Sequence, residues 1–229
     1  MNTNDLEKLS QVAYSFKETI EHSYNSVVDC LNNEVEGDFV ECGVAMGSQI
    51  GAFQCALRDN NVTNRIIWGF DSFEGIPLAG EFDTEQAGIG EITHDKFAPL
   101  EQRLVTSGIT AHSMESVLQN FSNWELSKDN LRLIKGWFQN TLEPTSKEIN
   151  KIAVLRLDGD LHESTLVCLE YLYPKVSKGG VVIIDDWGSL VGCRVAVEQY
   201  FNSIKKKMPT MIRVNESNQD NGVVFFIKS

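Results

Sequence analysis

The sequence predicts a doubly wound α/β fold with a mostly parallel sheet in a single domain, and three observations support this prediction. First, five short segments are apolar with little polar interruption: 39–44, 66–71, 131–137, 152–158 and 181–186. Such runs are typical of strands buried on both faces of a parallel sheet. Second, helix-like stretches lie between them, and this alternation favours parallel crossover units. Third, the 229 residues, of which 42% are apolar, suffice for one sizeable core.

Residues 1–36 are expected to form a helical lead-in to the main domain. Apolar residues recur there at steps of three and four, which is the periodicity of a helix. The recurring residues are Leu6, Leu9, Val12, Ala13, Phe16, Ile20, Val27, Val28 and Leu31.

The connections and the C-terminal end complete the expected sheet. Residues 49–59, 113–121 and 163–173 are the helix-like stretches between strands. Near the end of the chain, TMIRVNES (210–217) and GVVFFIKS (222–229) are separated by the polar turn NQDN. This pattern predicts an antiparallel hairpin that closes one edge of the sheet.

Residues 76–112 interrupt the alternation of strands and helices. The segment is rich in glycine and acidic residues and shows little periodicity. A loop of this length inside a compact domain is usually disordered or functional. We expect it to be a lid over the active site.

The charge of the chain bears on its partners and location. Lys and Arg number 20 against 32 Asp and Glu, so the net charge of −12 disfavours nucleic acid and anionic membranes as partners. A neutral or cationic small molecule fits better. No stretch approaches the ~20 apolar residues of a membrane span, and the polar start lacks the order of a secretory signal. We therefore expect a cytoplasmic protein.

The five cysteines are odd in number and scattered, and no C-x-x-C pair occurs. They are expected to be reduced residues of the core. A structural zinc site is disfavoured because the cysteines and the four histidines are not clustered at short spacings.

Glycines follow the first predicted strand, where an α/β sheet binds its ligands. Gly43 and Gly47 stand at the turn into the next helix, and Glu41 comes just before them. Glycine lets the backbone approach a ligand closely at this position. The spacing G-x-x-x-G differs from the G-x-G-x-x-G of dinucleotide binders, which disfavours a dehydrogenase. Glu41 indicates a cofactor with an amine or cationic group. The alternative for Gly47 is that it only eases the packing of the helix.

The second and third strand ends carry residues suited to an adenosine. Asp71 ends the second strand, where a carboxylate can accept hydrogen bonds from both ribose hydroxyls. Trp137 and Phe138 end the third strand and could flank the adenine with aromatic surface. The alternatives are that Asp71 caps the following helix and that Trp137 belongs to the core.

Acidic residues end the fourth and fifth strands. Asp158 follows one strand, and Asp185 and Asp186 follow the other, so neighbouring strands would bring three carboxylates together. Such a cluster is unfavourable unless a cation or shared protons neutralise it, and oxygen ligands select Mg²⁺, Mn²⁺ or Ca²⁺. We expect Asp160 to cap the following helix. An ordinary turn is the alternative for Asp185 and Asp186.

Five motifs resemble those of one known family, in the same order and over residues 37–201. They are ECGVAMGS, WGFDSFEGIP, KGWFQNTL, LRLDGDLHEST and IIDDWG. They are similar to the macrocin O-methyltransferase family of sugar O-methyltransferases that use S-adenosylmethionine and Mg²⁺. The resemblance implies a Rossmann-like class I methyltransferase fold with a seven-stranded sheet, and methyl transfer to a sugar hydroxyl on a glycan, nucleotide sugar or glycosylated natural product.

The resemblance also implies roles for individual residues. The cofactor-binding residues would be Glu41, Gly43, Gly47, Ser48, Asp71, Ser72, Phe73, Gly136, Trp137, Phe138 and Asp158. The ligands of Mg²⁺, or of Mn²⁺, would be Asp158, Asp185 and Asp186. The same positions resemble catechol O-methyltransferase, but Leu161 stands where that family has a lysine base. We expect Asp158, at the edge nearest the cofactor, to be the proton acceptor as well as a ligand; the alternatives are His162 or a water. His162 itself is expected to be an exposed residue of the first helical turn.

Two other functions and the oligomeric state remain open from the sequence. The acceptor could be a catechol or another small phenol, because a metal recognises adjacent oxygens whatever ring bears them. The domain could bind an adenosine ligand without catalysis. The chain could also form a homo-oligomer through the helical lead-in or the lid.

Overall fold

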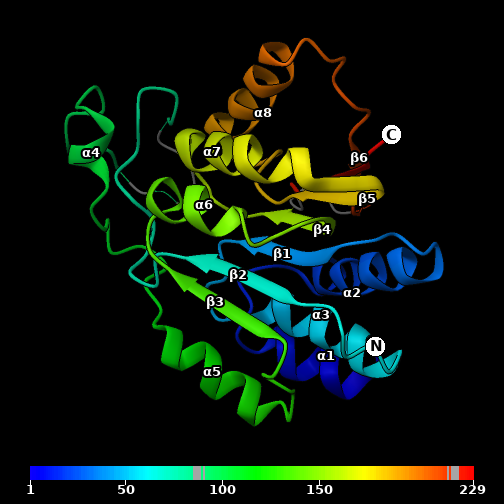
Figure 1. Ribbon diagram of the computed structural model, residues 1–229. Helices are drawn as coiled ribbons and strands as arrows, with labels where there is room; N and C mark the ends of the chain where they lie inside the picture. Colours follow the sequence, from blue (N-terminus) through cyan, green and yellow to red (C-terminus); the bar gives the residue numbers. More distant parts are fainter. Residues whose placement is uncertain (85–88, 90, 216, 218–221) are drawn as a thin grey trace.

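The five apolar segments form the parallel strands of one sheet (Figure 1). The computed structural model describes residues 1–84, 89, 91–215, 217 and 222–229. Its parallel strands are β1 (Asp38–Cys42), β2 (Ile67–Asp71), β3 (Leu131–Lys135), β4 (Ile152–Leu157) and β5 (Val176–Ile184). The sheet order is β3-β2-β1-β4-β5-β7-β6. The last two strands are β6 (Ile212–Arg213) and β7 (Val224–Ile227). They pair antiparallel to each other, and β7 pairs antiparallel to β5, so the predicted C-terminal hairpin is confirmed.

The register of the central strands places the carboxyl ends of β1, β4 and β5 at the same level of the sheet. The amide of Gly43 donates to the carbonyl of Phe70 at 2.8 Å, and that of Asp158 donates to the carbonyl of Cys42 at 2.8 Å. The amide of Asp185 in turn donates to the carbonyl of Leu157 at 2.9 Å. The hydrogen-bonded ladder thus runs one residue past each strand, and it brings the glycine turn and the acidic residues to one edge of the sheet.

Helices cover both faces of the sheet (Figure 1). One face buries α1 (Thr3–Ser10), α2 (Lys17–Asn32), α3 (Ser48–Asp59) and α5 (Met114–Asn123) in a first apolar cluster. The other face packs against α6 (Phe138–Ser146), α7 (His162–Leu172) and α8 (Val191–Ser203) in a second cluster. Buried residues on both sides of β1 and β4 explain why these strands show no polar alternation.

The helical lead-in consists of two helices, although the apolar periodicity of the sequence runs through both without interruption. Helix α1 ends at Ser10 and α2 begins at Lys17, so Val12, Ala13 and Phe16 lie outside both helices. Helix α1 packs on α3, where the Ser48 hydroxyl donates to the Leu9 carbonyl at 3.1 Å. The break lets residues 12–15 turn toward the carboxyl edge of the sheet, where they line a cavity.

Strand β5 begins earlier than expected. It starts at Val176, so Gly179 and Gly180 lie inside the strand and not before it. A Cβ on Gly180 would lie 3.0 Å from the Ala153 carbonyl oxygen, and the pairing with β4 shifts register nearby. Gly180 therefore allows a close approach of two strands, which a count of apolar residues does not reveal.

The segment 76–112 contains the short helix α4 (Leu100–Arg103) and an isolated bridge between Pro77 and Thr106. Residues 85–88 and 90 of this segment, and the hairpin turn at 218–221, lie outside the described residues. All five cysteines are free and buried, as expected. In the described part of the chain, none of the helices combines the length and apolarity needed to cross a membrane.

Candidate active site

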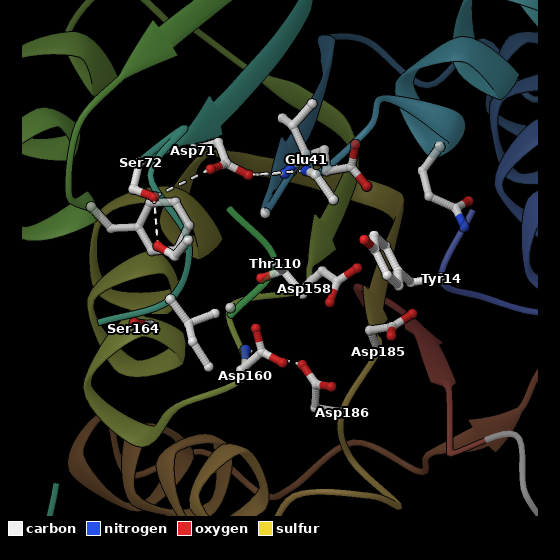
Figure 2. A pocket seen from close by; sticks show the side chains of 18 of the residues that line it. Tyr14, Glu41, Asp71, Ser72, Thr110, Asp158, Asp160, Ser164, Asp185 and Asp186 are labelled. Atoms are coloured by element: carbon white, nitrogen blue, oxygen red, sulfur yellow. Dashed lines mark hydrogen bonds between the residues drawn. The ribbon is translucent and has the colours of Figure 1, made fainter. Parts of the chain in front are cut away.

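A cavity of about 350 Å³ opens at the carboxyl ends of β1, β2, β4 and β5. Most of the expected site residues line it: Glu41, Gly43, Ser48, Asp71, Ser72, Gly136, Trp137, Phe138, Asp158, Asp185 and Asp186. Figure 2 shows the acidic residues arranged around this cavity. Gly47 and Phe73 are not among the described residues that line it. A cavity of this size suits a small-molecule ligand.

Gly43 is the point of closest approach between β1 and β4. Its φ angle is +92°, and a Cβ there would lie 1.7 Å from the carbonyl oxygen of Asp158. No other residue type fits, because both the backbone conformation and the space exclude a side chain. Gly47, with φ +89°, stands just before α3, where a Cβ would meet Val117 Cγ1 at 2.9 Å. Its geometry thus agrees with the alternative role of easing helix packing.

Asp71 holds the loop that follows β1. Its Oδ2 accepts hydrogen bonds from the amides of Val44 at 2.7 Å and Ala45 at 3.0 Å. Its Oδ1 accepts from the amide of Phe73 at 2.7 Å. The carboxylate borders the cavity as expected, and it also fixes the conformation of the glycine turn. Phe73 itself is a buried core residue with a positive φ of 53°.

The third strand end presents an aromatic residue to the cavity. Trp137 is half-buried and precedes α6, and Phe138 is buried as the first residue of that helix. The amide of Gly136 donates to the Asp71 carbonyl at 2.9 Å, which ties this turn to the end of β2. Ser72 donates its hydroxyl to the Gly75 carbonyl at 2.6 Å.

Arg156 is the charged residue that the sequence interpretation missed. It is the next-to-last residue of β4, is fully buried, and contacts three carboxylates. Its Nε lies 3.3 Å from Glu41 Oε1, and its Nη2 lies 3.2 Å from Asp158 Oδ2 and 2.5 Å from Asp185 Oδ1. An arginine inside an otherwise apolar strand was the available signal, because such a strand buries every side chain.

Glu41 is nearly inaccessible, although it borders the cavity. Loss of hydration raises the pKa of its carboxyl to about 8 against the opposing attraction of Arg156. The Arg156 guanidinium is also disfavoured by burial, but the carboxylates of Asp185, Asp158 and Glu41 outweigh this effect and raise its pKa. Glu41 and Arg156 therefore form one buried charge network beneath the cavity.

Asp158, Asp185 and Asp186 converge as the strand order requires. One oxygen from each can be chosen so that all three lie within 4.8 Å of one another. The pKa of Asp158 is raised by burial and, to a smaller extent, by the charge of Asp185. The pKa of Asp186 is raised by burial and, to a smaller extent, by the charge of Asp160. A bound cation would relieve this repulsion, and three carboxylates are the donor set that Mg²⁺ and Mn²⁺ prefer. The residues present therefore fit such an ion.

The expected capping role of Asp160 is wrong. Leu161 occupies the N-cap position of α7, and no side chain caps that position. Asp160 has a positive φ of 58°, and its amide donates to Asp186 Oδ2 at 3.1 Å. Its carboxyl borders the cavity beside the acidic cluster, because the left-handed backbone turns it away from the helix end.

His162 is buried, not exposed as expected. Asp83 from the 76–112 segment accepts a hydrogen bond from its amide at 2.9 Å. The ring of His162 lies 4.3 Å from that of Phe82 between centroids, and its Nε2 lies 3.0 Å from Gln199 Oε1. The sequence could not anticipate this cover, because Phe82 and Asp83 come from a segment 79 residues earlier.

Two distant segments border the open side of the cavity. Tyr14, from the break between α1 and α2, and Thr110 both line it. The Tyr14 hydroxyl lies 2.7 Å from His112 Nε2, so the two segments are in contact. Tyr14 is 70% exposed and is one of the lining residues labelled in Figure 2. No periodicity or motif in the sequence identified this residue.

The sheet order and the position of the cavity define a Rossmann-like class I methyltransferase fold. A solved structure of the O-methyltransferase NovP superposes with a TM-score of 0.75 and 35% sequence identity. The match covers 93% of this chain and 80% of that one.

Residues 8–225 match the family described as macrocin O-methyltransferase (TylF), and the chain belongs to that family. A demethyldecarbamoylnovobiocin O-methyltransferase of Streptomyces niveus is 41% identical over 181 residues, which cover 79% of this chain and 64% of the relative. An 8-demethyl-8-(2,3-dimethoxy-α-L-rhamnosyl)-tetracenomycin-C 4'-O-methyltransferase of Streptomyces olivaceus is 39% identical over 172 residues, which cover 74% and 60%. The chain thus spans less than two thirds of the length of these relatives.

Proposed function

We propose that this protein transfers a methyl group from S-adenosylmethionine to a hydroxyl of a sugar. The acceptor would be a glycan, a nucleotide sugar or a glycosylated natural product. The observation that carries the proposal is the convergence of Asp158, Asp185 and Asp186 beside the Gly43 turn, in one cavity. Family membership supports methyl transfer, and the name of the Streptomyces olivaceus relative, which includes a rhamnosyl group, supports a sugar acceptor.

The cofactor would lie along the ends of β1, β2 and β3. Gly43 and the Asp71-bound loop would receive the methionine part, and Glu41 would face its amine. Asp71 would accept from the ribose hydroxyls, since each carboxylate oxygen can accept more than one hydrogen bond. Trp137 and Phe138 would flank the adenine. The cofactor supplies a methyl group on a sulfonium, which an acceptor oxygen takes by in-line displacement.

The acidic cluster would prepare the acceptor hydroxyl. Asp158, Asp185 and Asp186 would hold Mg²⁺ or Mn²⁺, which supplies Lewis acidity and orients two neighbouring oxygens. Asp158 is the nearest of these residues to the Gly43 turn, and its carboxylate would take the hydroxyl proton. The 76–112 segment would cover the site and exclude water, and its contacts through Asp83 and Thr110 support this role.

The decisive test is a methyl-transfer screen with product masses. Nucleotide sugars, oligosaccharides and simple catechols are incubated with the protein and S-adenosylmethionine, with Mg²⁺ or with a chelator. We expect a mass gain of one methyl on a sugar, loss of turnover with the chelator, and at least a hundredfold loss in Asp158→Asn and Asp185→Asn. The control variant is Asp129→Asn, an exposed carboxylate that precedes β3 and does not border the cavity.

Each other outcome of the screen favours a different function. Methylation of catechols alone would show a phenol methyltransferase, and cofactor binding without any turnover would favour a binding domain. Full activity of the Asp158→Asn variant with the chelator present would exclude the metal role.

The remaining expectations belong to the same proposal. We propose that residues 1–229 act as one domain and that the protein works in the cytoplasm on a small molecule or glycan. The net charge of −12 supports the exclusion of nucleic acid. Light scattering would decide whether the protein is a homo-oligomer.

A further inference from the structure

Arg156 holds a position that neither catalysis nor substrate binding explains. Its side chain is fully buried within β4 and does not line the cavity. It reaches Glu41 on β1, Asp158 at the end of its own strand, and Asp185 at the end of β5. One guanidinium therefore lies behind the acidic cluster and contacts two of its three carboxylates.

The charges around Arg156 do not balance by themselves. Glu41, Asp158, Asp185 and Asp186 can carry four negative charges, and Arg156 supplies one positive charge on their interior side. A carboxylate cluster inside a protein is unfavourable without a cation. The planar guanidinium is suited to this place, because it stays charged when buried and offers several donors in fixed directions.

We propose that Arg156 is a positioning residue that acts as a permanent counter-charge. Its guanidinium keeps the carboxylates of Asp158 and Asp185 assembled at the cavity wall when no metal ion is bound. Arg156 and the metal ion then neutralise the same cluster from opposite sides, one from the interior and one from the cavity. This inference rests on the metal site of the proposed function.

The inference predicts that the metal ion can replace part of what Arg156 does. Removing the guanidinium leaves buried carboxylates unpaired, which should lower the melting temperature of the metal-free protein by roughly 10 °C. Saturating Mn²⁺ should restore at least half of this loss, because binding to the folded state stabilises it. A residue with a merely structural role would show the same loss with and without the ion.

The experiment measures melting temperatures of the full chain in a chelator and in Mn²⁺. Arg156→Met removes the charge, and Arg156→Lys keeps it without the fork. Arg103→Met is the matched control, since Arg103 is also a buried arginine, paired with Glu163 away from the cluster. We expect a much larger Mn²⁺ shift in Arg156→Met than in the wild type, and wild-type shifts in Arg156→Lys and Arg103→Met.

Each outcome decides the inference. Equal losses for Arg156→Met in chelator and in Mn²⁺ would overturn it while leaving the proposed methyl transfer intact. Absence of any Mn²⁺ shift in the wild type would overturn both the metal site and the inference. If Arg156→Met does not fold in either condition, the double variant Arg156→Met/Asp185→Asn should fold in chelator, because one unpaired charge has been removed, and its failure to fold would also overturn the inference.

Discussion

The loop after β1 depends on a single carboxylate, and its removal should affect both stability and cofactor binding. Asp71 accepts hydrogen bonds from the amides of Val44, Ala45 and Phe73. Ala45 has a positive φ of 47°, which is unfavourable for a residue with a Cβ, so the loop adopts a conformation that is costly without these bonds. The perturbation is therefore the pair of variants Asp71→Ala and Asp71→Asn.

The expected cost follows from the three hydrogen bonds to a charged group. Each is worth about 1.5–3 kcal/mol, but Asp71 is only half-buried, so water can replace part of what is lost. We expect Asp71→Ala to lower the free energy of unfolding by about 3 kcal/mol. Asp71→Asn keeps one acceptor oxygen and turns the other position into a donor, so its cost should be about 1.5 kcal/mol.

The assay combines urea unfolding with calorimetric titration of S-adenosylhomocysteine. In Asp71→Asn the dissociation constant of this ligand should rise by at least about tenfold, equivalent to about 1.4 kcal/mol. Asp38 is the matched control at the other end of β1, where it accepts from the Ile66 amide and from Trp68 Nε1, both at 3.0 Å. Asp38→Asn should lose similar stability and keep its affinity. Unchanged stability and affinity in Asp71→Asn would refute the reasoning.

Three further predictions concern other parts of the fold. Gly43→Ala should abolish binding of S-adenosylhomocysteine in calorimetry, because its Cβ would overlap the Asp158 carbonyl oxygen. Burial, and to a smaller extent the guanidinium of Arg156, lowers the pKa of His22 to about 4. The contribution of neutral His22 to stability is therefore complete above pH 6.5 and is lost as the pH falls toward 4. His22→Gln should therefore weaken the acid dependence of the unfolding free energy by up to about 3 kcal/mol, and an unchanged profile would contradict this. Asp83→Ala should speed proteolysis in the 76–112 segment, because the bond from the His162 amide is lost.

The strand ends could be predicted because their pattern is local. An apolar run followed by Asp71, Asp158 or Asp185 marks both a buried strand and the residue that emerges from it. The parallel arrangement then requires these residues to meet at one edge. The cavity residues Tyr14 and Thr110 could not be predicted, because their places depend on how irregular segments fold back over that edge.

Two errors share one cause. Asp160 was expected to cap α7, and His162 to be exposed, since both judgements used only neighbouring residues. In the structure the left-handed backbone at Asp160 directs its side chain to the cavity, and Asp83 takes the amide of His162. Contacts supplied by a distant segment thus override the usual preference of aspartate for a helix start.

The cofactor side and the acidic side of the cavity are joined by the same two strands. Gly43 meets the backbone of Asp158, and Glu41 meets Arg156, so β1 and β4 are in contact at both the surface and the interior of this edge. A change in the spacing of these strands would displace the Gly43 turn and the Asp158 carboxylate together. For an in-line transfer the distance between methyl donor and acceptor oxygen is critical, because small displacements cost large factors in rate. Variants at Gly43 and Arg156 should therefore lower the turnover rate by more than their weaker binding of cofactor or metal ion explains. Turnover rates that fall only in proportion to the occupancy of the two sites would contradict this coupling.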